Sequence, residues 1–410
     1  MKAIPAFQSD ANLKRRIRLH LKSLGFTKAT DGSLCPPDLE KETYRHLHRK
    51  QRKAKFDRSN PWLEEKLEEL KHHFASGAEI NPENIVAELE EIPPSKQNKE
   101  DWRGYLFRLA SLTWSVPVSS GYGRRMRFLV WDRSNNKLMG IIALGDPVFN
   151  MTARDTHLGW NAKQRAKGLV NVMDAYVLGA VPPYNQLLAG KLVACLVRTK
   201  EVAQAFERKY GTTKGIISGK RKHARLFVVT TTSSLGRSSL YNRLRLGDTK
   251  FFEPIGFTAG WGHFQINDRL FAEFRKFLAR KRGKYAKRAK AHQFGQGPNY
   301  RIRVVRLALE SLGMNPDILR HNLRREVFLC ALAKNAAKLL TGRAVQPNVR
   351  DVVTAAEVSA AARQRWLVPR AQRRPEFQNW NLEDTLRLIK GQSQPPAIIV
   401  AAPAPFAVNM

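Results

Sequence analysis

The chain divides into stretches with different patterns of apolar and polar residues. Up to about residue 95, apolar residues recur at helical spacing among charged ones, and Pro93 with Pro94 ends that pattern. Short apolar runs then alternate with helical stretches, a pattern that predicts a mixed α/β domain. The rest of the chain returns to helical spacing and ends in a segment rich in Pro and Ala. The predicted parts are a helical N-terminal region (1–95), a central α/β domain (96–268), a basic helical C-terminal region (269–390) and a disordered tail (391–410).

Within the central domain, apolar runs and turn residues predict individual elements. Two runs at 127–131 and 138–144 are separated by a gap rich in turn residues, which predicts an antiparallel hairpin. A buried strand at 175–181 is expected to lead into a long helix at 186–210. The remaining expectations for this domain are a strand at 226–232, a short helix at 238–246 and a closing strand pair at 251–266. In the C-terminal region, two or three short helices are expected within 299–342.

Charge changes this picture, because the chain carries 71 Lys and Arg against 35 Asp and Glu, a formal net charge of +36. Such an excess predicts a polyanionic partner, with nucleic acid the first choice. The densest cationic run follows Phe271, Phe274 and Phe277, whose helical spacing ties it to a packed helix. Its seven cations, predicted to contact nucleic acid, are Arg280, Lys281, Arg282, Lys284, Lys287, Arg288 and Lys290. An acidic segment at 62–92 is either a solvated helix face or an internal cover for a basic groove.

Several classes of protein find no support in the sequence. Three widely spaced cysteines make neither a disulfide framework nor a zinc knuckle, and no apolar stretch approaches the length of a membrane span. We therefore expect a cytoplasmic protein with no membrane partner. Phosphate-binding loops, zinc-ligand spacings and a Gly-x-Ser-x-Gly elbow are missing, so the sequence predicts no metal site and favours neither an ATPase nor a serine hydrolase.

The first candidate site follows a predicted strand at 145–150. Asp146 is either a cap for the backbone amides of a tight turn or, together with Asn150, a polar group at the mouth of a cleft.

The second candidate site is the loop that precedes the predicted long helix. Its Asn185, Gln186, Gly190 and Lys191 suit a phosphate or carboxylate, because free amides and the helix dipole meet there. Alternatively, Pro183 and Tyr184 only pack the joint between strand and helix.

The third candidate site is a group of hydroxyl side chains after the strand at 226–232. Ser239, Tyr241 and Arg243 lie on the short predicted helix, an arrangement typical of a polar cleft, although Thr runs also occur in strands for propensity alone. We expect the three sites to converge at one side of the sheet and bring together Asp146, Asn150, Tyr184, Asn185 and Tyr241.

Several of these motifs resemble those of a known protein family. The segments 145–150, 174–191, 238–246 and 256–264 resemble the core of the DruA-like family, named for protein A of the Druantia anti-phage defence system. The similarity spans roughly residues 122–342. It implies a bacterial intracellular defence protein that acts with a helicase-like partner and other proteins of the system. Relatives associated with transposase-like genes leave a role in a mobile element open.

Within that resemblance, the order of elements is similar to the acyltransferase fold of the GNAT superfamily and its phage DNA-modifying Mom branch. This similarity implies that the region from Gln186 to Lys191 holds a cofactor pyrophosphate and that Tyr241 protonates a leaving thiolate. The sequence itself leaves the cofactor unknown.

The sequence thus predicts a GNAT-like central mixed sheet with helical flanks, in a DNA-binding component of Druantia-type defence. A cleft with Asp146, Tyr184 and Tyr241 as catalytic residues would act on or sense nucleic acid. Its predicted ligand-binding residues are Asn150, Asn185, Gln186, Gly190, Lys191, Ser239 and Arg243. Whether chemistry occurs stays open: the alternatives are a Mom-like nucleobase modifier, a metal-dependent or transposase-like strand-cleaving enzyme using Asp146, Asp155 and Asp174, and a module that only binds. RNA remains an alternative partner.

Overall fold

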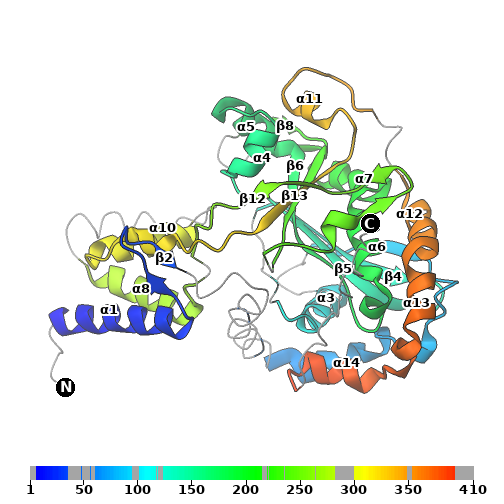
Figure 1. The fold of residues 1–410 in the computed structure, drawn as a ribbon, viewed down its shortest axis with the longest axis horizontal. Coiled ribbons are helices and arrows are strands. Elements are labelled where there is room, and N and C mark those ends of the chain that lie inside the picture. Colours follow the sequence, from blue (N-terminus) through cyan, green and yellow to red (C-terminus); the bar gives the residue numbers. More distant parts are fainter. Residues whose placement is uncertain are drawn as a thin grey trace, which may run out of the picture.

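A computed structural model describes most of the chain (Figure 1). The described residues are 6–35, 48, 56, 61–94, 101–116, 118, 123–214, 219, 221–234, 236–263, 265–281, 300–348 and 353–392. The predicted tail beyond residue 392 and the basic run from Arg282 to Lys290 therefore lie outside the described residues.

A seven-stranded mixed sheet forms the centre of the larger part of the molecule. Some of its strands alternate apolar with polar residues and others are apolar along most of their length, and side chains are buried on both faces of the sheet. The mixed α/β class and the hairpin of β4 and β5 are confirmed. In spatial order the strands are β12 (Glu253–Phe257), β13 (Glu326–Ala331), β9 (Val228–Thr232), β6 (Val172–Ala180), β5 (Lys137–Gly145), β4 (Arg125–Asp132) and β3 (Ala87–Glu91).

Neighbouring strands are antiparallel except β6 and β9, which are parallel. Parallel strands need a crossover connection, and here it runs through η4 (Tyr184–Leu187), α6 (Ala189–Cys195), η5 (Leu196–Arg198) and α7 (Lys200–Tyr210). The pairing covers only Val172–Asp174 against Val228–Thr230. Beyond Asp174 the ladder stops, and the strands are linked there by a side-chain hydrogen bond from Oγ1 of Thr231 to the carbonyl of Ala175 at 2.8 Å.

Three sequence predictions of individual elements are wrong. The single helix expected at 186–210 is broken, because Leu188 takes a left-handed conformation (φ 62°) and a 3₁₀ turn separates α6 from α7. The helix expected at 238–246 is only the turn η6 (Tyr241–Arg243), followed by the short hairpin of β10 (Arg245–Leu246) and β11 (Thr249–Lys250). The closing strand pair is a single strand, β12, whose partner β13 comes from the stretch expected to be helical.

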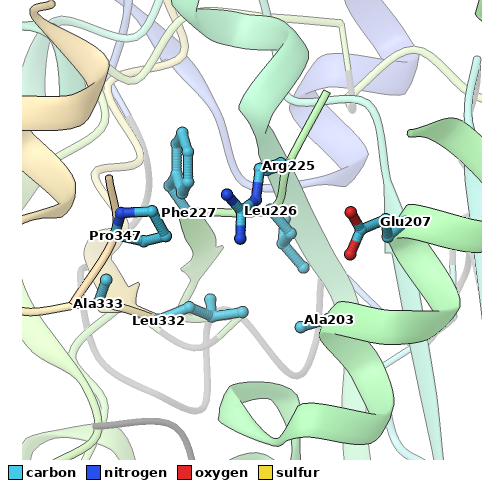
Figure 2. A pocket seen from close by; sticks show the side chains of 8 residues that line it. All are labelled: Ala203, Glu207, Arg225, Leu226, Phe227, Leu332, Ala333 and Pro347. Carbon is cyan, nitrogen blue, oxygen red and sulfur yellow. The ribbon is translucent and has the colours of Figure 1, made fainter. Parts of the chain in front are cut away.

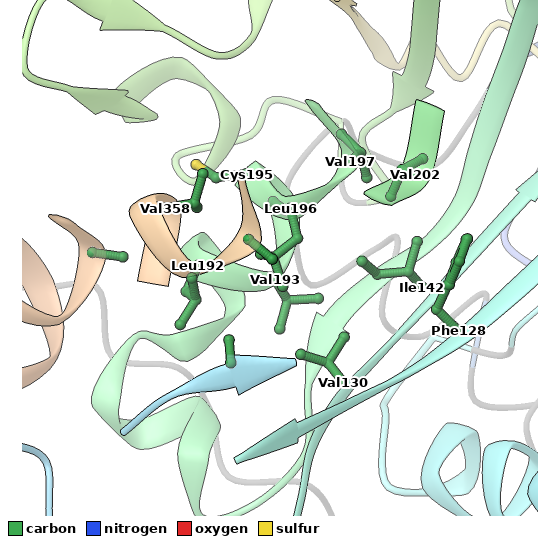
Figure 3. Close-up of a cluster of buried hydrophobic side chains, with 14 of the residues drawn as sticks. Phe128, Val130, Ile142, Leu192, Val193, Cys195, Leu196, Val197, Val202 and Val358 are labelled. Carbon is green, nitrogen blue, oxygen red and sulfur yellow. The ribbon is translucent and has the colours of Figure 1, made fainter. Parts of the chain in front are cut away.

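Helices cover both faces of the sheet. On one face, α6, α7 and α12 (Ala355–Ala362) bury a large apolar cluster, part of which appears in Figure 3 around Leu192, Val193 and Val358. On the other face, α3 (Trp102–Leu112) and α14 (Leu382–Ile389) pack over β4 and β5. Two short helices, α4 (Thr152–His157) and α5 (Ala162–Gly168), flank Leu158 and Trp160. These two residues and α11 (Ala336–Leu340) form a smaller apolar cluster with the ends of β6, β9 and β13.

A smaller helical unit projects from the sheet (Figure 1). Its own apolar core joins α1 (Ala6–Ser23), α8 (Asp268–Arg280) and α10 (Tyr300–Ser311), accompanied by the hairpin of β1 (Thr27–Lys28) and β2 (Leu34–Cys35) and the turn η7 (Pro316–Leu319). Most of this unit is inserted between β12 and β13. The domain boundaries stay a prediction, although the sheet takes β3 from before residue 95 and β13 from after residue 269.

The described part of the acidic segment forms ion pairs with nearby cations. Glu88 pairs with Arg133 and Glu90 with Arg103, both beside β3 and β4. Among the described helices, none is long and apolar enough to cross a membrane.

Candidate functional site

The register of the sheet does not bring the predicted site residues together in a single cleft. Gly145, just before Asp146, pairs with Asp174 near the start of β6, whereas Tyr184 follows the end of β6 beyond Ala180. Six residues of extended strand separate those two levels by about 20 Å. The expected convergence of Asp146 with Tyr184 is therefore wrong, because an antiparallel neighbour places the two loops at opposite ends of the sheet.

Tyr184 belongs to a buried polar network at the turn between β4 and β5. Its side chain is fully buried, its hydroxyl donates to Oδ2 of Asp132 at 3.0 Å, and it accepts from Nδ2 of Asn135 at 2.9 Å. Burial and the adjacent Asp132 carboxylate raise the pKa of Tyr184. This hydroxyl thus fastens the hairpin to the loop after β6. Its predicted catalytic role stays a prediction.

The neighbouring predicted residues are spread out. Asn150 is exposed in the loop after β5, and Asn185 beside Tyr184 keeps a buried Oδ1 that has no hydrogen-bond partner among the described residues. Ser239 is half-buried before η6. These three side chains do not form one group with Asp146.

The last residue pair of the β6–β9 ladder contains the most perturbed carboxyl in the described part of the sheet. Asp174 accepts a hydrogen bond from Oγ1 of Thr230 at 2.8 Å, and burial raises its pKa to about 6 despite that bond and the nearby Arg154 guanidinium. Tyr241 packs against Phe252 and Phe328, with ring centroids 5.2 Å away in both cases.

Burial also acts on Tyr241, raising the pKa of its hydroxyl to about 12, while a hydrogen bond with Thr231 acts in the opposite direction. Thr230 and Thr231 are successive residues of β9 and point to opposite faces. Asp174 and Tyr241 therefore lie on the two sides of the β6–β9 pair, and the Asp174 charge also helps to raise the pKa of Tyr241.

The carboxylates of the metal-dependent alternative do not meet. Asp146 pairs with Arg124 at 2.7 Å, whereas Asp155 pairs with Arg154 at 2.7 Å and with Arg165 at 3.1 Å. Across the described ranges there is no group of three His, Cys, Asp or Glu side chains placed to hold a metal ion.

A cluster of cations forms beside the start of α6, and we call it the cation cluster. Its members are Lys191 of α6, Arg243 of η6, Arg365 of the π-helical segment η9 (Arg363–Leu367) and Arg370 of α13 (Val368–Arg373). Burial together with Arg243, Arg365 and Arg370 lowers the pKa of Lys191, the expected effect of like charges held close together. In the part of the chain that the structure describes, none of the four makes an ion pair.

The cation cluster contains predicted and unpredicted residues. Lys191 and Arg243 were predicted, and Gln186 belongs to the same place because its carbonyl accepts from Nε of Arg370 at 3.1 Å. Gly190 faces Leu240, which a Cβ would approach to 3.7 Å. Arg365 and Arg370 were missed. The signal for them was a second basic run, with five arginines between residues 363 and 374.

The predicted nucleic-acid-binding run is described only at its start. Arg280 is exposed in the last turn of α8. Lys281 instead pairs with Asp10 at 2.8 Å, and its ammonium lies 4.6 Å from the ring centroid of Phe277.

A separate pocket lies beside α7 (Figure 2). Its cavity of about 80 Å³ is lined mainly by apolar groups, including Leu226, Phe227 and Leu332, with Glu207 and Arg225 at its edge. None of the predicted site residues lines it.

Comparison with known proteins agrees with the resemblance found in the sequence. The family model for Druantia protein DruA matches residues 38–342. Druantia protein DruA of Escherichia coli (strain UMEA 4076-1) is 46% identical over 384 residues, which cover 94% of this chain and 93% of that protein. No solved structure matches the chain. On both the family model and this relative, the chain belongs to the family of Druantia protein DruA.

Proposed function

We propose that this chain is a nucleic-acid-binding component of a Druantia-type anti-phage defence system, and that the cation cluster holds phosphates of DNA. The observation that carries the proposal is the convergence of Lys191 from α6, Arg243 from η6, and Arg365 and Arg370 from the adjoining η9 and α13. In this proposal the protein acts in the bacterial cytoplasm with a helicase-like protein and other proteins of the system.

Physical chemistry supports an anionic ligand at this place. Burial and three nearby guanidinium groups disfavour the charged form of Lys191, because burial removes water from around its ammonium and the guanidinium groups repel it. Unfavourable local arrangements of this kind are typical of functional sites. A bound phosphate would relieve the repulsion, and guanidinium groups pair with phosphate oxygens through two parallel hydrogen bonds.

Nucleic acid fits better than a small anion for two reasons. The cations come from α6, η6, η9 and α13, so they outline a surface that several phosphates can share. The whole chain also carries a formal net charge of +36, which attracts a polyanion far more strongly than a single small ion.

The direct test compares two variants with equal loss of charge. Arg243→Gln, Arg365→Gln and Arg370→Gln together remove three charges from the cluster, and Lys163→Gln, Lys167→Gln and Lys338→Gln remove three from exposed positions on α5 and α11. Fluorescence anisotropy with a labelled 30-base-pair DNA should show affinity lower by roughly tenfold or more for the first variant alone.

Pyrophosphate as a competitor separates a phosphate-backbone site from a small-anion site. The proposal expects only general salt-like weakening of DNA binding by pyrophosphate. If the cluster variant lost pyrophosphate binding but kept wild-type affinity for DNA, the cluster would be a small-anion site and the proposal would be wrong.

A second function is favoured by Asp174 and Tyr241: group transfer to a nucleobase, the chemistry of the GNAT-like, Mom-like alternative. Asp174 would accept a proton near neutral pH and Tyr241 would donate one. Mass spectrometry of nucleosides and DNA ends, after incubation with acyl-CoA donors and metal ions, tests it. Modified nucleosides from the wild type but not from Asp174→Asn or Tyr241→Phe would support group transfer. New DNA ends would favour strand cleavage instead. Unchanged DNA would contradict both reactions and leave nucleic-acid binding as the function.

A further inference from the structure

The helical unit carries a large excess of positive charge. Its described residues, 6–35, 265–281 and 300–325, contain seventeen Lys and Arg against six Asp and Glu. Five of those six carboxylates already lie in ion pairs within the unit. The pairs are Asp10 with Lys281, Asp31 with Arg320, Asp268 with Arg301, Glu273 with Arg16 and Glu310 with Arg306. The remaining positive charge is therefore poorly compensated inside the unit.

One face of α1 concentrates this charge. One side of α1 faces the unit's core through Leu13, Ile17 and Leu21, each of which is almost fully buried. Arg15, Arg18 and Lys22 follow one another at spacings of three and four residues, which places them on a single stripe.

This outward stripe of α1 is opposite the core and carries no carboxylate. Arg15, Arg18 and Lys22 are exposed and make no ion pair among the described residues. Leu19 lies beside them with 54% of its surface exposed. Arg16, by contrast, points to α8, where it meets Glu273.

We propose that the helical unit is a duplex-DNA-binding module that lays the outward stripe of α1 into the major groove. This inference rests on the proposed function, since it assigns a second contact to the same nucleic acid. An α-helix with its side chains is about 10–12 Å across and fits the major groove of B-DNA, which is about 12 Å wide. The three cations of the stripe reach phosphates, and Leu19 at its edge offers an apolar contact to thymine methyl groups.

The stripe suits duplex DNA better than other nucleic acids. Duplex RNA has a deep and narrow major groove that admits no helix. Single strands are held by stacking on aromatic side chains, and the stripe formed by Arg15, Arg18, Leu19 and Lys22 has no aromatic ring. The position of the unit, inserted between β12 and β13 and projecting from the sheet, leaves α1 at the side of the molecule (Figure 1).

The test measures affinity and its salt dependence for three ligands of one sequence: duplex DNA, duplex RNA and single-stranded DNA. Arg15→Gln, Arg18→Gln and Lys22→Gln are combined in one full-length variant. The expected result is at least about tenfold weaker binding of duplex DNA and a log–log salt slope smaller by about two to three units, with much smaller changes for the other ligands. Circular dichroism checks that α1 still folds.

Two matched variants make the outcome decisive. The triple substitution of Lys163, Lys167 and Lys338 removes the same charge elsewhere and is expected to change little. Leu19→Gln should reduce the preference for AT-rich over GC-rich duplexes without changing the salt slope.

Equal losses for all three ligands would show that the stripe acts only through bulk charge and would overturn the inference. Wild-type affinity of the α1 variant, together with weakened binding by the cation-cluster variant, would overturn the inference and leave the proposed function standing. Absence of binding by the wild type would overturn both.

Discussion

Arg124 and Asp146 tie the end of β5 to the segment that enters β6. Nε of Arg124 donates to Oδ1 of Asp146 at 2.7 Å, and the backbone N–H of Arg124 donates to Oδ2 at 3.0 Å. The same guanidinium donates to the carbonyls of Leu169, Val170 and Val172. Asp146 therefore orients a cation that holds three backbone carbonyls.

Asp146→Asn is expected to lower stability. The substitution removes the charge that balances Arg124, and hydrogen bonds to charged groups contribute about 1.5–3 kcal/mol. Thermal unfolding should show a melting temperature lower by a few degrees, with nucleic-acid affinity unchanged. Asp248→Asn is the matched control, since Asp248 is exposed in the turn between β10 and β11. Normal stability with loss of anti-phage protection would instead support the predicted catalytic role.

Tyr184→Phe removes one hydroxyl from a buried network. Asp132 and Asn135 would each lose a partner, which costs about 1–3 kcal/mol when the groups stay buried. Urea unfolding should therefore shift to lower denaturant concentration, while DNA affinity stays at the wild-type value. Tyr105→Phe in α3 serves for comparison. An unshifted urea midpoint would mean that the hydroxyl is not structural.

Asp174 is expected to make stability fall as the pH rises. Its pKa is about 6 in the folded protein, against an ordinary value of 3.8, so the folded state keeps a proton that the unfolded chain has lost. The wild type should lose stability relative to Asp174→Asn mainly between about pH 4 and pH 6 and reach a nearly constant difference above about pH 7. Denaturant unfolding at pH 4, 5, 6 and 7 measures this difference. A difference that does not change with pH would show that the carboxyl titrates normally.

Arg365→Gln is expected to raise stability and lower affinity at the same time. Removing Arg365 takes away one of the guanidinium groups that disfavour the charged form of Lys191, which relieves a small cost in the free protein. The same change deletes a phosphate contact in the proposed complex. Unfolding and anisotropy measurements on the same preparation separate the two effects. Lower stability with unchanged affinity would assign Arg365 a structural role.

Local pattern predicted much of the architecture. The hairpin of β4 and β5 follows from two apolar runs around a turn, and α8 follows from the spacing of Phe271, Phe274 and Phe277. The pattern failed at β13, where a buried strand rich in apolar residues lies between helices and cannot be distinguished from a helix by periodicity alone. It also failed at Leu188, since a left-handed leucine has no sequence signal.

The candidate site was predictable only in part. Lys191 and Arg243 were found because polar residues followed predicted strands, but Arg365 and Arg370 come from a segment more than 120 residues further along the chain. Their proximity depends on the packing of α12 against α6, a long-range contact that local pattern does not encode. The separation of Asp146 from Tyr184 likewise depends on which end of β6 each loop reaches.

The salt dependence of DNA binding tests the central claim most directly. The affinity of the wild type for duplex DNA is measured from low to high salt beside a variant with Lys191, Arg243, Arg365 and Arg370 all replaced by Gln. Each phosphate contact contributes about 0.9 to the slope of log affinity against log salt, so the slope should fall by about three. An unchanged slope in a variant that folds normally would show that the cation cluster does not contact phosphates and would contradict the account.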